Sequence, residues 1–307
     1  MESRTGPGPR GWRAYGLLLV VMALGGAACS SPSEAPPEAD PSVSKTAASE
    51  TATPSAPASE TAPQRRNPRF EEWRVPPGTH PHDVAVAPDG RVWFTGQGDG
   101  TIGRLDPKTG RITSIDLPSG AAPHGVIVDA RGNAWVTDGG LNAIVRVDRR
   151  THRVQVHPLP DASDANLNTA TFAGDGTLWF TGQAGVHGRL RPDGTVAVFD
   201  SPRGDGPYGI ATTPGGDVWL ASLAGSYIAR VRSAQGQLDV VDVPTAGGGA
   251  RRVWSDSHGH LWVTEWYAGK LARYDPARER WTEWQLPGDD PQPYAVYVDD
   301  VDHVWVT

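Results

Sequence analysis

Cysteine is almost absent from this sequence: Cys29 is the only one among 307 residues. A single thiol excludes an internal disulfide and any site built from several thiolates. Because Cys29 precedes the part of the chain that could fold, a cysteine nucleophile in that part is excluded as well. Its stability has to come from burial of apolar side chains and from strand pairing, for which about 240 residues are enough.

Long apolar runs and an excess of positive charge are also lacking. The formal net charge is −7 and the charged residues are scattered, which argues against a nucleic-acid partner. The apolar run Leu17–Leu24 has only eight residues, too few to cross a bilayer as a helix. By contrast, 37 glycines and 28 prolines punctuate the chain, which is typical of short strands joined by tight turns.

The chain begins with the parts of a secretory signal. Three arginines precede the apolar run, and the small residues Gly25–Ala28 lead from it to Cys29. This arrangement resembles a bacterial lipobox, whose cysteine is acylated and becomes the mature N-terminus, although Gly26 stands where such boxes usually carry leucine. We therefore expect a lipoprotein signal over residues 1–29 and an extracytoplasmic protein anchored to the cell membrane through Cys29. The alternative is an ordinary secretory signal cut near Ala28.

Residues 30–68 are composed almost entirely of Pro, Ala, Ser, Glu and Thr. So few apolar side chains cannot offset the entropy lost on folding. We expect this segment to be a disordered tether between the lipid and a domain over residues 69–307.

A repeat begins at Arg69, and each copy carries a tryptophan in the same context. These tryptophans are Trp93, Trp135, Trp179, Trp219, Trp262 and Trp305. They are separated by 42, 44, 40, 43 and 43 residues. A period near 42 without a helical pattern predicts an all-β fold, a β-propeller whose blades have four strands each.

One blade can be predicted strand by strand. Its four strands are expected at His124–Asp129, Asn133–Thr137, Ala143–Asp148 and Arg153–Leu159. The repeated tryptophan then lies on the second strand, where it packs between blades. A proline near the end of each fourth strand fits the outer edge of a blade, since proline cannot donate to a central ladder.

The repeats predict about 5.6 blades. The segment Phe70–Pro76 has the pattern of a fourth strand without its blade, and Val304–Thr307 that of a second strand. A propeller closes by pairing its first and last segments, so we expect seven blades in the complete protein and a C-terminally incomplete chain here. The alternative is a six-bladed ring with a defective last blade.

The first strand of each blade is expected to line the central channel. Eleven residues before the repeated tryptophans stand His82, His124, Asn168, Tyr208, Arg251 and Tyr294. Three residues after them stand Gly96, Asp138, Gly182, Ser222 and Glu265. The hairpin geometry predicts that His124 faces Asp138 and that Arg251 faces Glu265 at one mouth of the channel. Polar side chains that converge there predict a small-ligand site.

Structural roles would account for the same residues. Arg251 and Glu265 could form a cross-strand ion pair, the two histidines follow prolines and could be turn residues, and the tyrosines could simply pack. The pattern Gly98-x-Gly100-x-x-Gly103 matches a dinucleotide fingerprint, but it opens onto a strand and offers no helix N-terminus.

Three further histidines fall in turns at the opposite mouth. They are His258, His260 and His303. Their spacing indicates no metal site.

The segments PHGVIVDARGNAWVTDGGLNAIVRVD and DSHGHLWVTEWYAGKLARYDP resemble blades of the streptogramin lyase (virginiamycin B lyase) family. The resemblance covers residues 69–307. It implies a seven-bladed enzyme that linearises type B streptogramins by elimination. One blade supplies a histidine, and the next supplies Glu-Pro-His and a glutamate three residues after its tryptophan. The second histidine transfers a proton beside Mg²⁺ held by the carboxylates.

Aligned on the last two repeated tryptophans, the family's catalytic residues are replaced. Arg251 stands for the first histidine, and Gln292-Pro293-Tyr294 stands for Glu-Pro-His. The final glutamate would follow Thr307. Arginine cannot act as a base at neutral pH, and an ordinary tyrosine is a poor one.

A second register matches the first two blades. There His82, His124 and Asp138 reproduce the order of two histidines and a carboxylate, and they are the best candidates for catalysis. The other carboxylate is missing, because Ala122 stands two residues before His124.

Three functions remain open from the sequence. The first is a lyase-like monomer that binds a small ligand through Asn168, Tyr208, Arg251, Glu265, Gln292 and Tyr294. The second is an active Mg²⁺-dependent carbon–oxygen lyase, or a lactonase, that confers antibiotic resistance. The third is a scaffold for another protein.

Overall fold

The computed structural model describes residues 71–160 and 164–307, and this part of the chain contains strands and turns but no helix. Consequently it contains no helix able to span a membrane. The signal, Cys29 and the tether lie outside the described residues. Five four-stranded antiparallel sheets and one two-stranded sheet follow one another along the chain.

Each four-stranded sheet is one blade, built from consecutive strands. The first blade has β1 (Pro81–Val86), β2 (Val92–Gly96), β3 (Thr101–Asp106) and β4 (Arg111–Asp116). The second has β5 (Pro123–Val128), β6 (Ala134–Asp138), β7 (Ala143–Val147) and β8 (Val154–Pro158). The third has β9 (Leu167–Phe172), β10 (Leu178–Gly182), β11 (Val186–Leu190) and β12 (Val196–Asp200). The fourth has β13 (Pro207–Thr212), β14 (Val218–Ser222), β15 (Tyr227–Val231) and β16 (Leu238–Asp242). The fifth has β17 (Ala250–Ser255), β18 (Leu261–Glu265), β19 (Lys270–Asp275) and β20 (Arg280–Gln285), and the two-stranded sheet has β21 (Val296–Val298) and β22 (Val304–Val306).

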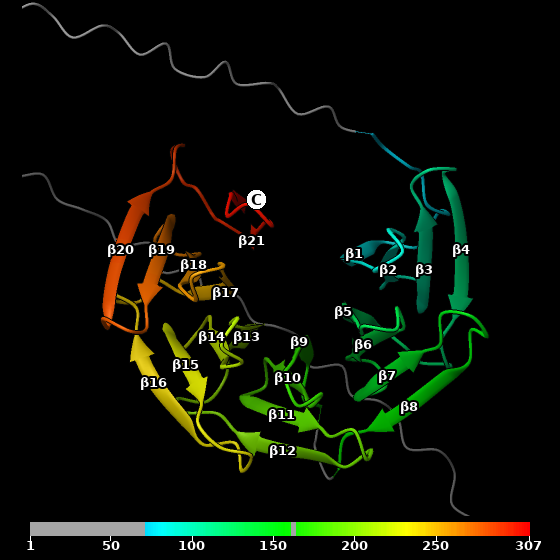
Figure 1. Cartoon of the computed structure of the whole chain (residues 1–307), viewed down its shortest axis with the longest axis horizontal. Helices are drawn as coiled ribbons and strands as arrows, with labels where there is room; N and C mark the ends of the chain where they lie inside the picture. The colour runs from blue at the N-terminus through cyan, green and yellow to red at the C-terminus, as the bar shows by residue number, and fades with distance from the viewer. Residues whose placement is uncertain (1–70, 161–163) are drawn as a thin grey trace, which may run out of the picture. The chain divides into compact units, whose positions relative to one another are not determined.

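The blades are arranged around a common axis. The first strands of neighbouring blades contact one another, and the fourth strands, such as β8 and β16, lie on the outside (Figure 1). This is a β-propeller, as the 42-residue period predicts. The strands of the second blade lie within about one residue of their predicted bounds.

The predicted strand at Phe70–Pro76 is wrong in its described part, since residues 71–80 form no strand. A fourth strand needs the third strand of its own blade as a hydrogen-bonding partner. The described residues contain no such strand beside this segment.

The repeated tryptophans lie on the second strand of each sheet, as predicted. Trp93 is fully buried, and its Nε1 donates a hydrogen bond to the carbonyl of Gly132 in the next blade at 3.2 Å. The guanidinium of Arg104, on the neighbouring strand β3, lies 5.2 Å from the Trp93 ring centre. Such a cation–π contact adds about 0.5–1 kcal/mol. By contrast, Trp305 in the two-stranded sheet is 52% exposed.

The first hairpin of every four-stranded blade contains a β-bulge. In the second blade Pro123 pairs with Asp138 and Gly125 with Thr137, so His124 has no partner in the ladder. The shift falls at the same place in the other four blades. The predicted cross-strand pairs are therefore wrong by one residue. Ala250, not Arg251, faces Glu265.

Candidate functional site

The structure brings the predicted channel residues together at one mouth of the ring. We call the channel cluster His82, His124, Asn168, Tyr208, Arg251 and Tyr294. The rings of His82 and His124 lie 3.9 Å apart between centres, and His124 Nδ1 lies 3.2 Å from the carbonyl oxygen of Asn168. The rings of His124 and Tyr208 are nearly perpendicular, with their centres 6.5 Å apart.

A chain of polar contacts crosses the mouth. Arg251 donates a hydrogen bond to the Tyr208 hydroxyl at 2.6 Å, and this hydroxyl lies 3.3 Å from that of Tyr294. The Tyr294 hydroxyl lies 3.3 Å from His82 Nε2. Side chains from β17, β13 and β1, together with the segment before β21, are thus joined over one site.

Arg251 is a buried cation held by aromatic rings. Its guanidinium carbon lies 3.5 Å from the ring centre of Tyr294, 4.4 Å from Trp266 and 4.6 Å from Tyr208. The side chain is 8% exposed, and it forms no ion pair within the described part of the chain. Burial of a charge without a counter-ion is unfavourable, and ring contacts compensate only in part. The site can therefore accept an anion.

Several polar atoms of the cluster have no hydrogen bond of standard geometry among the described residues. They are His82 Nδ1, Arg251 Nε and both amide atoms of Asn168, whose side chain is fully buried. Because buried polar groups are normally paired, His82 Nδ1 and Arg251 Nε are candidates for contact with a ligand, whereas the fully buried Asn168 amide lies beside Tyr208 and helps to lower its pKa.

The protonation states follow from burial and from the two neighbouring guanidinium groups. Burial, together with His82, Arg252 and Arg251, lowers the pKa of His124 to about 3, so this ring is neutral at physiological pH. Burial opposes ionisation of Tyr208, but hydrogen bonds from Tyr294 and Arg251 outweigh it and lower its pKa. Burial and Tyr208 raise the pKa of Tyr294. Tyr208 is thus the tyrosine that loses its proton first.

Threonines two residues after the repeated tryptophans hold channel residues in place, except in the fourth blade, where Ala221 stands at this position. Thr95 Oγ1 donates to the carbonyl of His124 in the next blade at 3.0 Å, and Thr137 Oγ1 donates to that of Asn168 at 2.5 Å. The same hydroxyl of Thr137 accepts from Gly125, whose N–H is freed by the bulge. The recurring Trp-x-Thr signal was visible in the sequence, but its role was missed. Trp266, which contacts Arg251, could not be predicted from the repeat, because the other blades have no tryptophan at its position.

Asp138 does not face His124, since the bulge places it opposite Pro123. Its Oδ1 accepts the N–H groups of Ala122 and Leu141, both at 2.9 Å, and burial raises the pKa of the carboxyl. The carboxylate thus holds the loop after β6 and the segment before β5 together.

Glu265 forms no ion pair with Arg251 and belongs to a different group. Burial and then Glu283 raise the pKa of Glu265 to about 7. Glu283 accepts hydrogen bonds from Thr245 at 2.6 Å and from Lys270 at 3.3 Å. Gln292 is exposed.

The channel cluster does not fit Mg²⁺. This ion prefers carboxylate and other oxygen ligands in octahedral geometry. The mouth instead presents two imidazoles, two phenols, one amide and a guanidinium. Among the described residues, the only oxygen of Asp138 with hydrogen-bond partners is Oδ1, which accepts two backbone N–H groups, and Oδ2 alone is too few carboxylate ligands for Mg²⁺. The Arg251 cation would repel a second cation.

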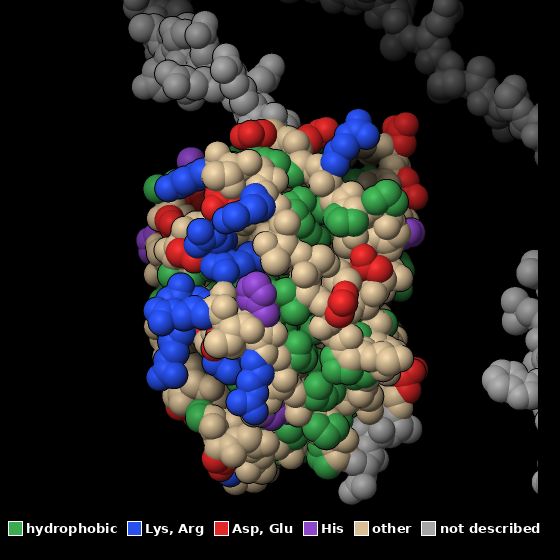
Figure 2. All heavy atoms as spheres, turned by 90° about the vertical axis from the view of Figure 1, so that its right-hand side faces the viewer, with side chains coloured by type: hydrophobic (Ala, Val, Ile, Leu, Met, Phe, Trp, Pro, Cys, Tyr) green, Lys and Arg blue, Asp and Glu red, His purple; other side chains and the backbone are tan. Residues whose placement is uncertain are grey.

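Basic side chains gather on the face that carries the first two blades, where the sequence predicted only scattered charge (Figure 2). A cavity of about 410 Å³ there is lined mainly by Arg91, Arg104, Asp106, Arg111, Arg149, Arg150 and His152. Much of this charge is paired, because Asp89 contacts Arg104 at 2.9 Å, Arg91 at 3.0 Å and Arg149 at 3.8 Å. The absence of a nucleic-acid partner stays a prediction.

Comparisons with known proteins agree with this architecture. A virginiamycin B lyase from Nocardia farcinica (strain IFM 10152) is 35% identical over 130 residues, which is 41% of this chain and 44% of that protein. The crystal structure of virginiamycin B lyase from Staphylococcus aureus superposes with a TM-score of 0.71 and 26% identity, over 78% of this chain and 80% of that one. A catalytically inactive variant of it, crystallised with quinupristin, gives 0.72 and 25% over 78% and 81% of the chains. The model of the virginiamycin B lyase family matches residues 56–307, and this chain therefore belongs to that family.

Proposed function

We propose that this protein binds a small organic anion at the channel cluster, and that it does so outside the cytoplasm, anchored to the membrane by a lipid on Cys29. The observation that carries the binding proposal is Arg251, a buried guanidinium without an acidic partner among the described residues. A carboxylate is the anion of choice, since its planar oxygens match the planar donors of arginine. The surrounding rings favour an aromatic or apolar body.

The family's usual chemistry is poorly supported here. Arg251 cannot take up a proton at neutral pH, and Gln292 is a weaker metal ligand than a glutamate. The Staphylococcus aureus relative crystallised with quinupristin supports a small-molecule ligand for a propeller of this shape. Binding without turnover is therefore the function that the site favours.

Elimination by a different base is the second candidate, and the lowered pKa of Tyr208 favours it. Its phenolate would remove the proton α to a carbonyl. The electron pair of that C–H bond would form a double bond, and the adjacent C–O bond would break with its pair on a departing carboxylate. Arg251 would stabilise the phenolate before the step and the departing anion after it.

The test of binding uses the full chain and matched ligand pairs. Benzoate and hippurate are expected to raise the melting temperature, whereas benzamide and hippuramide are not. Arg251→Gln should abolish this preference. Arg273→Gln, which removes an arginine stacked on Trp262, should retain it. Equal effects of acids and amides on the parent protein would overturn the proposal.

The test of elimination is incubation with quinupristin, followed by mass spectrometry. A linearised product that disappears in Tyr208→Phe would establish the second candidate. Intact quinupristin after prolonged incubation with the parent would exclude it. For the anchor, the parent protein should incorporate a labelled fatty acid in cells and Cys29→Ala should not; an unlabelled parent would contradict lipidation.

A further inference from the structure

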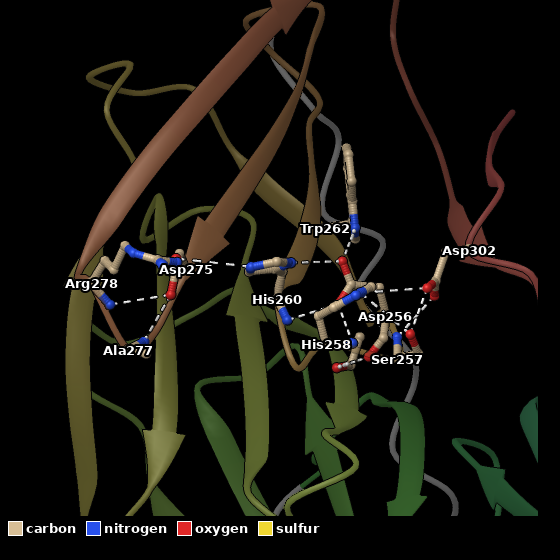
Figure 3. Close-up of polar contacts among 10 residues, drawn as sticks. Asp256, Ser257, His258, His260, Trp262, Asp275, Ala277, Arg278 and Asp302 are labelled. Carbon is tan, nitrogen blue, oxygen red and sulfur yellow. Dashed lines mark hydrogen bonds and ion pairs between the residues drawn. The ribbon is translucent and has the colours of Figure 1, made fainter.

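The turn between β17 and β18 holds a buried carboxylate surrounded by donors (Figure 3). Asp256 Oδ1 accepts the N–H groups of His258 and His260 at 3.0 and 2.9 Å. Its Oδ2 accepts Trp262 Nε1 at 3.0 Å and lies 3.0 Å from His260 Nδ1. The turn is thereby tied to the repeated tryptophan.

Part of this arrangement is a structural repeat. In the second blade, Asn133 Nδ2 and Trp135 Nε1 donate to Asp129 Oδ2 at 2.9 and 3.1 Å. In the two-stranded sheet, Asp299 contacts His303 and Trp305 in the same way, at 3.3 and 3.0 Å. A turn of this kind folds with either Asn or His in the fourth place after the aspartate. The roles of Asp256 and His260 in the turn are therefore not specific to it.

His258 is the residue that the repeat does not explain. The corresponding positions are Arg131 in the second blade and Val301 in the two-stranded sheet. The His258 ring stacks beside that of His260, with centres 5.8 Å apart. Its Nδ1 lies 3.3 Å from Ser257 Oγ and 3.5 Å from Asp302 Oδ2. Asp302 is itself fixed by the N–H and hydroxyl of Ser257, at 2.9 and 2.5 Å.

We propose that Asp256, His258 and His260 bind a divalent transition metal of the Zn²⁺ class, with Asp302 orienting His258 beside it. One ligand atom from each of the three residues lies within 4.8 Å of the others. Ligands of a tetrahedral Zn²⁺ lie about 3.4 Å apart, so a small contraction closes the site. Two imidazoles and one carboxylate suit Zn²⁺ far better than Mg²⁺ or Ca²⁺. The proposal departs from the expectation, based on spacing alone, that His258 and His260 form no metal site; His303 is not part of it.

A bound metal would replace one contact within the turn. His260 Nδ1 contacts Asp256 Oδ2, and a metal between them would take over this contact while Trp262 keeps its hydrogen bond to the carboxylate. A hydrogen-bond partner on a metal ligand is a common means of fixing its orientation. The exposed side of His258 leaves a fourth position open to water.

The experiment is a calorimetric titration of the full, chelator-treated chain with ZnCl₂, with MgCl₂ as the comparison. We expect one equivalent of Zn²⁺ and no binding of Mg²⁺ at the same concentration. His258→Gln should weaken Zn²⁺ binding by at least about 100-fold, because it removes a ligand. Asp302→Asn should weaken it by about tenfold.

Three further variants separate ligation from folding. His260→Asn installs the residue that completes the equivalent turn at Asn133 and loses the 3.8 Å contact of His260 Nε2 with Asp275, so the metal-free melting temperature should change little while Zn²⁺ binding is lost. His303→Asn alters the same kind of turn without a third ligand, and Cys29→Ser removes the thiol; both should bind as the parent does. No binding by the parent, or unchanged binding by His258→Gln and His260→Asn, would overturn the proposal.

Discussion

The two ends of β17 bury opposite charges in opposite ways. At the channel end, the Arg251 cation lies among rings and has no ion-pair partner within the described residues. At the turn end, the Asp256 carboxylate is surrounded by four donors. A ligand at the channel end adds to contacts already made, whereas a metal at the turn end has to replace one. The channel end can bind a ligand in its present form, whereas the main role of the Asp256 carboxylate at the turn end is to stabilise the turn.

The largest expected effect is on stability at the turn. Asp256→Ala would leave two backbone N–H groups and Trp262 Nε1 without their acceptor. We expect the free energy of unfolding to fall by about 3 kcal/mol, measured by urea denaturation. Asp300→Ala, in an exposed turn, should change it by less than about 0.5 kcal/mol. Equal effects of the two substitutions would show that the hydrogen bonds to Asp256 contribute little to stability.

A pH dependence is expected from Glu265, the buried carboxyl at the channel end of β18. Its pKa is raised to about 7 in the folded state from an ordinary 4.5, so the folded protein holds this proton more tightly than the unfolded chain. The resulting stability is fully present below pH 4.5 and is lost as the pH rises through 7, a change of roughly 2–3 kcal/mol.

Glu265→Gln should remove that part of the pH dependence, and the exposed Glu279→Gln should not. Denaturation at pH 4.5, 6 and 7.5 measures both variants against the parent. Parallel curves for the parent and Glu265→Gln would contradict the assignment.

A smaller effect is expected where threonine links two blades. Thr137→Val keeps the shape of the side chain but removes the hydroxyl that serves Gly125 and Asn168. We expect a loss of about 1 kcal/mol in the free energy of unfolding. Thr113→Val on β4, which is exposed, is the matched control. A neutral Thr137→Val would mean that the bulge is held by packing alone.

The smallest stability effect is expected at Arg251 itself. Arg251→Met loses ring contacts but also removes the cost of burying a cation, so the free energy of unfolding should change by less than about 1 kcal/mol. The pKa of Tyr208 should rise, since one of its hydrogen-bond partners and the nearby positive charge are gone, while Tyr294 remains. Phenolate absorbance during a pH titration reports this, with Tyr208→Phe identifying the signal. An unchanged Tyr208 titration would show that Arg251 does not control it.

Sequence reasoning located the channel residues because the repeat places them at a fixed distance from each tryptophan. It failed where local geometry departs from a regular ladder. The bulge put Pro123 and Ala250 opposite the carboxylates in place of His124 and Arg251. Nothing in the repeat marked Trp266 as a partner of Arg251. The spacing of His258 and His260 concealed that a tight turn brings their rings side by side.

The bulge at the start of each first strand has an evolutionary consequence. The residue at the bulge, such as His124 or Arg251, has no partner on the neighbouring strand, so its side chain does not have to fit one. Histidine, asparagine, tyrosine and arginine could therefore be exchanged there, blade by blade, while the sheets went on pairing unchanged. The five four-stranded blades thus share one backbone arrangement at the channel mouth, while the side chain that each presents there differs.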